Sequence, residues 1–420
     1  MAQPTARALA ITALAEWRAG RRFADSILQD LLLASRLSAA DRAFATELFY
    51  GALRNLTLLD FWIGLLRSAP VDDKSRDLLR LGLYQLIVLR TPGHAAVFET
   101  VALASKHRRP LINAVLRGAQ RRAAELEAAA QAAPLATRAS HPEFFLERWQ
   151  QAFGPAKTKA LCDWNNQAAP VYARINGLKI SRDKFLAENP SAAAVPGLEN
   201  FVRLGQIPVE ALHRGECYIQ DPSTRLACEL LNPQPDEIVL DACAAPGGKT
   251  GLLAELMQNR GTLVACEREI GRVEILRQNL ERLGATTAEI VRHDWQAGGL
   301  KTESEPRLFD RILVDVPCTN TGVLRRRVDL RWRLTARDFV RMPQVQWQIL
   351  SAVIPHLRVG GSLVYSTCSI EAGENEEVVQ RALEEFAFLE LEETRSTVSF
   401  RDHLDGAFAA RLRCVGGDVV

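Results

Sequence analysis

Two cysteines stand at points where a short apolar segment gives way to a loop. They are Cys318, in the sequence DVPCTNTG, and Cys368, in LVYSTCSIE. A free cysteine is usually a small buried hydrophobe, so either one alone carries little information. A thiolate in the same place can act as a nucleophile, and covalent catalysis of this kind divides one difficult reaction into easier steps. The surroundings of the two cysteines have to decide between these interpretations.

Acidic side chains end the neighbouring apolar segments in the same way. Segments with strand character end at Asp241, Glu267, Asp294 and Asp315. In a parallel sheet, ligands bind outside the carboxyl ends of the strands. Acids and cysteines at so many of these ends predict a binding and catalytic site rather than ordinary solvated loops.

A glycine-containing loop follows the first of these segments and suggests what the site binds. Asp241 leads into Cys243-Ala244-Ala245-Pro246-Gly247-Gly248-Lys249. The end of this loop resembles a phosphate-binding loop, but Cys243 replaces its first glycine and Pro246 removes an N–H from the phosphate cradle. Glu267 lies where an acid commonly accepts hydrogen bonds from a ribose. We therefore expect a nucleoside cofactor without phosphates, S-adenosylmethionine, with a nucleotide triphosphatase as the disfavoured alternative.

The elements that must position these residues follow from the hydrophobic pattern. Apolar residues recur at helical spacing over residues 1–125, with Ser38 as an expected N-cap, and the alanine-rich residues 126–140 look like a linker. Residues 141–205 mix helix and strand patterns, which predicts a small α+β domain. Over residues 206–420 short apolar strands alternate with helices, which predicts an α/β domain with a parallel, doubly wound sheet.

Composition and charge limit the class of protein. The chain has 420 residues, 47% of them hydrophobic and 24% charged, as in soluble globular proteins. We find no apolar segment of signal-peptide or membrane-span length and no C-x-x-C pair among the eight cysteines, so we expect a cytoplasmic protein with reduced thiols and no metal. Residues 1–122 carry 18 Lys and Arg against 10 Asp and Glu, a net charge of +8, and the rest of the chain carries −6. This asymmetry favours a nucleic-acid-binding N-terminal part, although a solvated helical surface would have the same charge.

Three segments, DACAAPGGKT, DVPCTNTGVLRRR and YSTCS, together resemble the signature motifs of the RNA (cytosine-5)-methyltransferases of the RsmB/Nop2 (NOL1/NOP2/Sun) family. The Pro317-Cys318 pair and the Thr367-Cys368-Ser369 triplet are similar to that family's two-cysteine hallmark. The N-terminal segments DRAFATELFYGALRN and LGLYQLIVLR resemble the helical RNA-binding domain of NusB type. The resemblance extends over residues 5–413 and has the domain order of the bacterial members that methylate 16S ribosomal RNA.

The resemblance implies a fold and a role for each candidate residue. It implies a NusB-like helical domain, a connecting α+β domain and a Rossmann-like class I methyltransferase domain. Cys368 would attack the cytosine, Asp315 would bind the edge of the base, and Cys318 would help to release the methylated product. The cofactor pocket would include Cys243, Ala244, Ala245, Pro246, Gly247, Gly248, Lys249, Glu267, Asp294 and Asp315.

A basic segment directly follows the Cys318 motif. Residues 322–334 contain five arginines and a tryptophan. Such a run is usually a solvated face, but its position after the catalytic motif favours contacts to RNA phosphates and stacking on bases. The predicted RNA-binding residues are Lys249, Arg325, Arg326 and Arg327.

Several questions stay open at this level. A non-enzymatic RNA-binding protein with an inactive methyltransferase domain would share the domain order, although the intact Cys368 and glycine loop argue against it. A transfer RNA substrate would need the same active site as a ribosomal one. Lys249 and nearby arginines are candidates for the cation that promotes ionisation of Cys368. The oligomeric state does not follow from the sequence.

Overall fold

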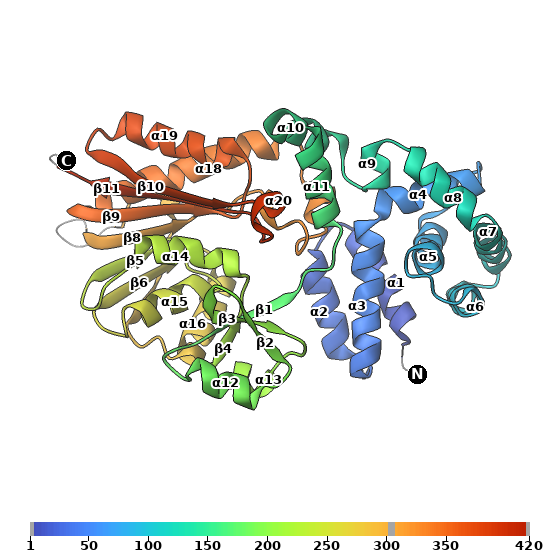
Figure 1. The fold of residues 1–420 in the computed structure, drawn as a ribbon, viewed down its shortest axis with the longest axis horizontal. Coiled ribbons are helices and arrows are strands. Elements are labelled where there is room, and N and C mark those ends of the chain that lie inside the picture. Colours follow the sequence, from blue (N-terminus) through green and yellow to red (C-terminus); the bar gives the residue numbers. More distant parts are fainter. Residues whose placement is uncertain (1–3, 301–306, 417–420) are drawn as a thin grey trace. The chain divides into compact units, whose positions relative to one another are not determined.

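The computed structural model describes residues 4–300 and 307–416 and divides them into two compact units (Figure 1). The first unit contains residues 4–168 together with residues 324–334, and the second contains the other described residues. The chain therefore passes between the units three times.

The first unit is built from helices, as the pattern over residues 1–125 predicts. Thr5, Ser38 and Asp72 cap three of them, because each side chain accepts a hydrogen bond from a backbone N–H of the first turn. The N-cap predicted at Ser38 is thus confirmed. The helices are α1 (Ala6–Arg18), α2 (Ala24–Ala34), α3 (Ala39–Arg54), α4 (Leu56–Leu66), α5 (Asp73–Leu83), α6 (Gly93–Leu103), α7 (Arg109–Arg121), α8 (Ala123–Ala132), α9 (Leu135–Arg138), α10 (Glu143–Phe153), α11 (Pro155–Asn165) and α17 (Leu330–Arg333), with a π-helical turn at Tyr84–Val88.

The predicted linker at residues 126–140 is instead part of the helical unit. Most of it forms α8 and α9, and Leu126 and Ala130 are buried in the same core as the preceding helices. Trp62 Nε1 donates a hydrogen bond to the carbonyl oxygen of Leu126 at 2.9 Å. Alanine has the highest helix propensity, and the small side chains let α8 pack closely. An alanine-rich composition was therefore the wrong reason to expect a linker.

Residues 324–334 belong to the helical unit although they lie far along the chain. Val328 is buried in its core, and α17 carries Arg331, whose side chain is fully buried. The Arg331 guanidinium donates to Oδ1 of Asn166 at 2.7 Å and to the carbonyl oxygen of Asn165 at 2.9 Å. This part of the basic run therefore contributes to the packing of the helical unit.

A four-stranded antiparallel sheet opens the second unit, with strand order β2-β3-β1-β4. The pairing of β4 with β1 sets Cys217 opposite Ile175, so the α+β segment continues past the predicted limit at residue 205. Helices α10 and α11, at the start of that predicted segment, belong to the first unit. The elements are β1 (Val171–Ile175), α12 (Arg182–Glu188), β2 (Ala192–Val195), β3 (Leu198–Leu204), α13 (Val209–Arg214) and β4 (Cys217–Ile219).

The main sheet has seven strands in the order β10-β11-β9-β8-β5-β6-β7. The five strands from β9 to β7 in this order are parallel, which confirms the predicted α/β class. The edge differs from a purely parallel sheet, because β11 is antiparallel to both β9 and β10. Only residues 398–406 connect β10 to β11, too few for a crossover. The strands are β5 (Ile238–Asp241), β6 (Thr262–Glu267), β7 (Ala288–Arg292), β8 (Phe309–Asp315), β9 (Leu357–Thr367), β10 (Leu389–Thr397) and β11 (Ala407–Cys414).

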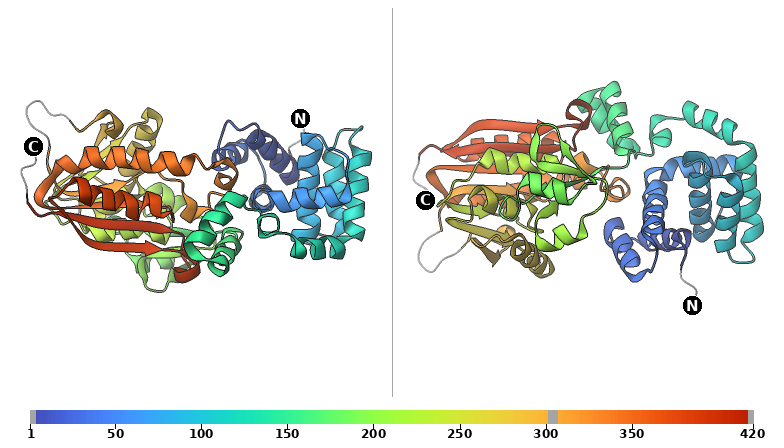
Figure 2. Two further views of the ribbon diagram at one scale, coloured as in Figure 1. Left: turned by 90° about the horizontal axis from the view of Figure 1, so that it is seen from above. Right: turned by 60° about the horizontal axis from the view of Figure 1, so that its bottom comes forward.

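Helices cover both faces of this sheet (Figures 1 and 2). Successive residues of β8 face opposite helix layers: Ile312 packs in one apolar cluster and Leu313 in the other. One layer contains α14 (Arg225–Leu231), α15 (Gly248–Leu256) and α16 (Ile270–Leu283), and the other contains α18 (Asp338–Val353) and α19 (Glu376–Glu385). A short helix, α20 (Ser399–Asp402), precedes β11. Across residues 4–300 and 307–416, no helix is long and apolar enough to span a membrane.

Candidate active site

The two cysteine loops meet because they leave neighbouring parallel strands. In the β8–β9 pair, Asp315 is opposite Ser366, so Cys318 and Cys368 follow within a few residues at the same edge. Their Sγ atoms are 3.3 Å apart, within hydrogen-bonding distance for thiols. Cys318 is buried and Cys368 is partly exposed. The structure thus brings together the two cysteines that are 50 residues apart in the sequence.

Close backbone packing holds the two loops against each other. The Gly322 N–H donates to the carbonyl oxygen of Cys368 at 3.0 Å, and the Gly406 N–H donates to the carbonyl oxygen of Gly322 at 2.8 Å. A Cβ atom at Gly322 would lie 2.7 Å from the Cys368 carbonyl oxygen and 2.7 Å from the Gly406 Cα. Any side chain at position 322 would therefore push the cysteine loops apart.

Asn320 contacts both cysteines. Its Oδ1 accepts a hydrogen bond from the Cys368 thiol at 3.0 Å, and its Nδ2 donates to the Cys318 carbonyl oxygen at 2.7 Å. The residue has a positive φ of 59°, a conformation that asparagine tolerates better than most residues. Asn320 thus orients the Cys368 thiol from the loop that carries Cys318.

An ion pair lies at the ends of β5 and β8. Lys249 Nζ is 2.8 Å from Oδ2 of Asp315, and Oδ1 of Asp315 accepts a hydrogen bond from Ser366 Oγ at 2.7 Å. Burial is the largest single influence on the pKa of Lys249 and lowers it, but attraction to Asp315, the hydrogen bond with Asp315 and smaller contributions from Cys228 and Cys368 together raise it. Lys249 is therefore a cation whose charge acts on both Asp315 and Cys368.

The thiol of Cys318 is held in its protonated form. Its hydrogen bond with Cys368, followed by burial and by the charges of Cys368 and Glu374, raises the pKa of Cys318 well above that of a free thiol. Cys318 can therefore act as a hydrogen-bond donor to Cys368. Cys368, which is partly exposed, is the member of the pair that a substrate can reach.

The predicted cofactor loop joins β5 to α15. The Ala244 N–H donates to the carbonyl oxygen of Cys266 at 2.9 Å, and the Gly247 N–H donates to the carbonyl oxygen of Ala244 at 2.8 Å. Gly247 has a φ of +106°, which only glycine adopts readily. The N–H groups of Ala244 and Gly247 already donate to backbone carbonyl oxygens, and Pro246 has no N–H, so the loop has few N–H groups left to bind phosphates. This geometry disfavours the triphosphatase alternative.

The acid that ends β6 and the acid that follows β7 are both held by neighbouring backbone N–H groups. Glu267 Oε1 accepts hydrogen bonds from the backbone N–H groups of Arg268 and Glu269, at 2.8 and 2.9 Å. Glu267 Oε2 is 3.3 Å from the Arg272 guanidinium. Asp294 lies two residues beyond the end of β7, and its Oδ1 accepts from the Gln296 N–H at 3.0 Å. Both carboxylates therefore have fixed orientations at the carboxyl edge of the sheet.

The predicted RNA-binding arginines lie in the helical unit. Arg325 is buried, with its guanidinium 3.8 Å from the ring centre of Trp164. Arg326 is half-buried, and Arg327 is exposed and forms an ion pair with Asp25 at 3.0 Å. Arg325 therefore stacks on an aromatic ring of the protein itself, and Arg327 is the most accessible of the three.

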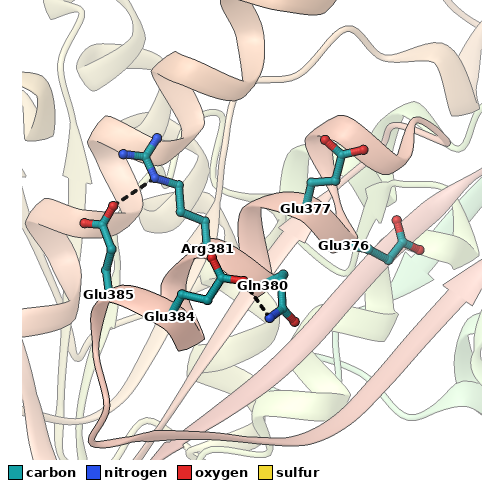
Figure 3. Close-up of a pocket in the computed structure, with 6 residues that line it drawn as sticks. All are labelled: Glu376, Glu377, Gln380, Arg381, Glu384 and Glu385. Atoms are coloured by element: carbon teal, nitrogen blue, oxygen red, sulfur yellow. Dashed lines mark hydrogen bonds and ion pairs between the residues drawn. The ribbon is translucent and has the colours of Figure 1, made fainter.

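The surface hollow drawn in Figure 3 is separate from these residues. It is lined by side chains of α19 alone, and Arg381 pairs with Glu385 at 3.0 Å along the helix. Such a row is the solvated face of an amphipathic helix. The described residues also contain no group of three or more His, Cys, Asp or Glu side chains that could hold a metal ion. The lining residues of the hollow are Glu376, Glu377, Gln380, Arg381, Glu384 and Glu385.

Comparison with known proteins identifies the family. Residues 228–412 match the 16S rRNA methyltransferase RsmB/F family, residues 4–121 the NusB family, and residues 141–191 the ferredoxin-like domain of RsmF/B-like methyltransferases. The probable ribosomal RNA small subunit methyltransferase B of Synechocystis sp. is 37% identical over 402 residues, a match that covers 91% of this chain and 89% of that protein. The chain belongs to the RsmB/F family.

Further relatives support the assignment over the full length. Ribosomal RNA small subunit methyltransferase B of Escherichia coli (strain K12) is 37% identical over 406 residues, covering 90% of this chain and 92% of that protein. The solved structure of PH0851 has a TM-score of 0.79 and 22% sequence identity, covering 98% of this chain and 99% of that one, and thus has the same fold. This RsmB/F family member is an RNA methyltransferase, as the resemblance of its motifs predicts.

Three contributors to the site lie outside the predicted set. Asn320 and Gly322 follow Cys318 within four residues, and Glu374 lies six residues after Cys368. A glycine in the motif and an asparagine before it are sequence signals of a tight loop. Glu374 has no such signal, because it stands in a run of surface-like glutamates.

Proposed function

We propose that this RsmB/F family member uses S-adenosylmethionine to methylate carbon 5 of a cytosine in 16S ribosomal RNA, through a covalent bond between Cys368 and the base. One observation carries the proposal: the Cys318 and Cys368 Sγ atoms are 3.3 Å apart at the carboxyl edge of the sheet. Two adjacent thiols, one buried and one partly exposed, suit a reaction in which one attacks and the other assists departure.

The residues at the edge of the sheet fit S-adenosylmethionine. The loop from Cys243 to Lys249 offers little to a phosphate, and Glu267 presents a carboxylate at the end of the next strand, where a ribose diol would bind. Asp294 is the proposed partner of the adenine amino group, and the loop would surround the rest of the molecule. When bound, S-adenosylmethionine supplies an electrophilic methyl group on a sulfonium.

Cys368 is the proposed nucleophile. Carbon 5 of cytosine is a poor nucleophile, and addition of the Cys368 thiolate to carbon 6 makes carbon 5 enamine-like and able to accept a methyl group. An unperturbed thiol, with a pKa of about 8.5, is only a few per cent ionised at pH 7. The ammonium group of Lys249, which interacts with Cys368, is the proposed cation beside the attacking sulfur.

Asp315 is the proposed ligand of the cytosine edge. Lys249 and Ser366 use one lone pair on each carboxylate oxygen, which leaves further acceptor capacity for the amino group and ring nitrogen of a base. Because Lys249 and Ser366 hold the carboxylate in place, a base that binds to it would meet Cys368 in a defined orientation.

Cys318 is proposed to assist release of the product. Its hydrogen bond with Cys368 and the charge of Cys368 both raise its pKa in the free enzyme. When Cys368 becomes a neutral thioether on carbon 6, its charge is lost and its sulfur is only a weak hydrogen-bond acceptor, so the Cys318 thiol transfers its proton to water more readily at that stage. A Cys318 thiolate can then accept the carbon 5 proton, after which the bond between Cys368 and carbon 6 breaks.

Binding of RNA is proposed to use the basic N-terminal part together with Lys249, Arg326 and Arg327. Residues 4–121 match the NusB family, and residues 1–122 carry a net charge of +8. Relatives are named for the small ribosomal subunit, which favours 16S ribosomal RNA over transfer RNA. Arg325 is proposed to act indirectly, because its guanidinium is buried against Trp164.

Substitution of the two cysteines tests the mechanism. We expect Cys368→Ser to abolish methylation while S-adenosylmethionine still binds, and Cys318→Ala to accumulate a covalent protein–RNA adduct, seen as a slow band on a denaturing gel. The adduct should disappear in the double variant. Cys414→Ala is the matched control, since Cys414 is an equally buried free cysteine of β11 outside the site.

Bisulfite sequencing of ribosomal and transfer RNA, from cells with and without this gene, tests the substrate. A cytosine of 16S ribosomal RNA should lose protection when the gene is absent. Protection lost only in transfer RNA would overturn the assigned substrate. Retention of a tenth of the wild-type single-turnover rate by Cys368→Ser would overturn the covalent mechanism, and no methyl transfer by the wild type would favour a purely RNA-binding role.

A further inference from the structure

A buried carboxylate lies directly behind the two cysteine loops. Glu374 is only 1% exposed, although its neighbours in the chain form the solvated face of α19. A buried carboxylate is costly unless hydrogen bonds replace its hydration, so such a residue needs a structural reason. Its role follows from the groups that donate to it.

Each oxygen of Glu374 accepts two hydrogen bonds. Oε2 accepts from the Thr319 N–H at 2.9 Å and from Gln346 Nε2 at 2.8 Å. Oε1 accepts from Ser369 Oγ at 2.8 Å and also from Thr319 Oγ1. These donors are all neutral, and hydrogen bonds to a charged acceptor are stronger than neutral ones.

Two of the three donor residues directly follow the cysteines. Thr319 comes directly after Cys318, and Ser369 comes directly after Cys368. Gln346, from α18, also donates to the carbonyl oxygen of Pro317 at 3.0 Å, so it fixes the other side of Cys318. Glu374 is therefore a single acceptor shared by the loops of β8 and β9.

We propose that Glu374 is the positioning residue that holds the two thiols of the active site at their reacting separation. It acts by joining Thr319 to Ser369, the residues that follow the two cysteines. The catalytic consequence rests on the proposed function, whereas the effect on thiol spacing does not. Loss of these hydrogen bonds should let the two cysteine loops separate, so that Cys318 no longer reaches the adduct formed by Cys368.

Two substitutions separate the length of the side chain from its charge. Glu374→Asp keeps the charge but withdraws the carboxylate by one methylene, so that it cannot reach both loops. Glu374→Gln keeps the length: its oxygen can accept from the Thr319 N–H and Gln346, while its NH₂ can donate to the hydroxyl oxygens of Thr319 and Ser369. If Glu374 positions the loops, Glu374→Asp should disturb the spacing of the two thiols and Glu374→Gln should largely preserve it.

Oxidation by diamide measures the spacing without RNA or cofactor. Each thiol loses its hydrogen, the two sulfurs form a disulfide, and diamide gains both hydrogens and two electrons to become the hydrazine. The Sγ atoms must close from 3.3 Å to a bond length of about 2.05 Å, so the rate depends on how the loops are held. Peptide mapping by mass spectrometry quantifies the disulfide between Cys318 and Cys368.

We expect disulfide formation to be at least tenfold slower in Glu374→Asp and within threefold of wild type in Glu374→Gln. Tyr365→Phe is the matched control, because it removes the hydrogen bond from Tyr365 to the carbonyl oxygen of Glu374 at 2.6 Å and leaves the carboxylate in place. It should oxidise within twofold of wild type. All four proteins are compared below their thermal unfolding midpoints. The proposal would be overturned if Glu374→Asp formed the disulfide at the wild-type rate, or if Tyr365→Phe slowed its formation as much as Glu374→Asp does.

Methylation kinetics test the consequence for catalysis. Glu374→Asp should lower kcat about tenfold with little change in KM, and should accumulate the covalent adduct as Cys318→Ala does. Glu374→Gln should retain at least a third of wild-type kcat. If Cys368→Ser keeps its methylation activity, the proposed function fails while the oxidation result still decides the positioning role. Slow oxidation of Glu374→Asp without a change in its kcat would show that the thiol spacing set by Glu374 does not serve the reaction.

Discussion

Burial keeps most of the cysteines of this protein inert. It raises the pKa of Cys217 to about 11 and those of Cys162, Cys228 and Cys266 to about 12. These thiols pack as small apolar groups in the interior of the protein. Cys368 differs from these four because it is partly exposed and forms hydrogen bonds with Cys318 and Asn320. The contrast between these environments is what makes one thiol of the chain a credible nucleophile.

The reacting residues are predictable from the sequence because they stand in short motifs at strand ends. Cys318, Cys368 and Asp315 follow apolar strands directly, and the sheet brings these ends together. The residues that hold them in place are less visible, since Glu374 acts on Thr319 across 55 residues of chain. Local sequence patterns do not predict a hydrogen bond between such distant residues. The separation of the two thiols therefore could not be predicted from the sequence.

Asp241 should make stability fall as the pH rises. Burial raises its pKa to about 7, although a hydrogen bond from Thr250 opposes this. Between about pH 4 and pH 7 the folded protein holds a proton on Asp241 that the unfolded chain releases. This group therefore lowers the free energy of unfolding across that range, by at most about 1.4 kcal/mol per pH unit, with the full loss present above pH 7.

Urea unfolding of wild type and Asp241→Asn at pH 5.5, 6.5 and 7.5 measures this effect. The asparagine variant should gain stability relative to wild type as the pH increases, because its amide does not ionise. Comparison at each pH removes the contribution of the other titrating groups. A difference that stays constant from pH 5.5 to 7.5 would contradict the raised pKa.

At the scale of elements, the segment that follows the Cys318 loop does more than present basic side chains. Oδ2 of Asp329 accepts a hydrogen bond from the Ala24 N–H at 2.9 Å, at the first residue of α2. Phe23, the N-cap residue of α2, supplies no side-chain hydrogen bond. A carboxylate from 305 residues further along the chain thus caps this helix.

Asp329→Ala should destabilise α2 by roughly 1–2 kcal/mol, the usual cost of losing a helix cap with a negative charge. Hydrogen exchange of the α2 amides reports this locally and should become about tenfold faster or more. Asp30→Ala is the control, because Asp30 lies in the middle of α2 and its ion pair with Arg22 is exposed on both sides, and such pairs contribute little. Equal exchange in the two variants would show that Asp329 does not cap the helix.

Element boundaries were predictable where hydrophobic period and capping residues agree, as at Ser38 and along the strands from β5 to β9. They were not predictable where distant segments complete a unit. Residues 324–334 read as a basic surface run, yet Arg331 is buried and binds carbonyl groups of the helical unit. The alanine-rich sequence of α8 wrongly predicted a linker, because its composition does not indicate which residues pack against distant helices.

At the scale of the whole molecule, charge is divided between an N-terminal part of +8 and a remainder of −6. Deletion of residues 1–122 is a poor test of their role, because it would expose Val328 of segment 324–334, which packs in the helical core. Neutralising exposed cations in the full chain avoids this problem. Lys106, Arg117 and Arg121 are suitable, since all three are exposed around α7.

If these cations bind RNA phosphates, each neutralised phosphate releases a condensed counterion. Changing all three to glutamine should weaken RNA binding and reduce the slope of log affinity against log salt by roughly 0.7–0.9 for each phosphate that is no longer neutralised. The control is the triple variant Lys184→Gln, Arg260→Gln and Arg277→Gln, which removes the same charge from exposed positions of the acidic part. Filter binding from 50 to 300 mM salt measures both. A shallower slope in the α7 variant alone assigns phosphate binding to the helical unit, whereas equal slopes in both variants would mean that net charge, rather than this surface, drives association.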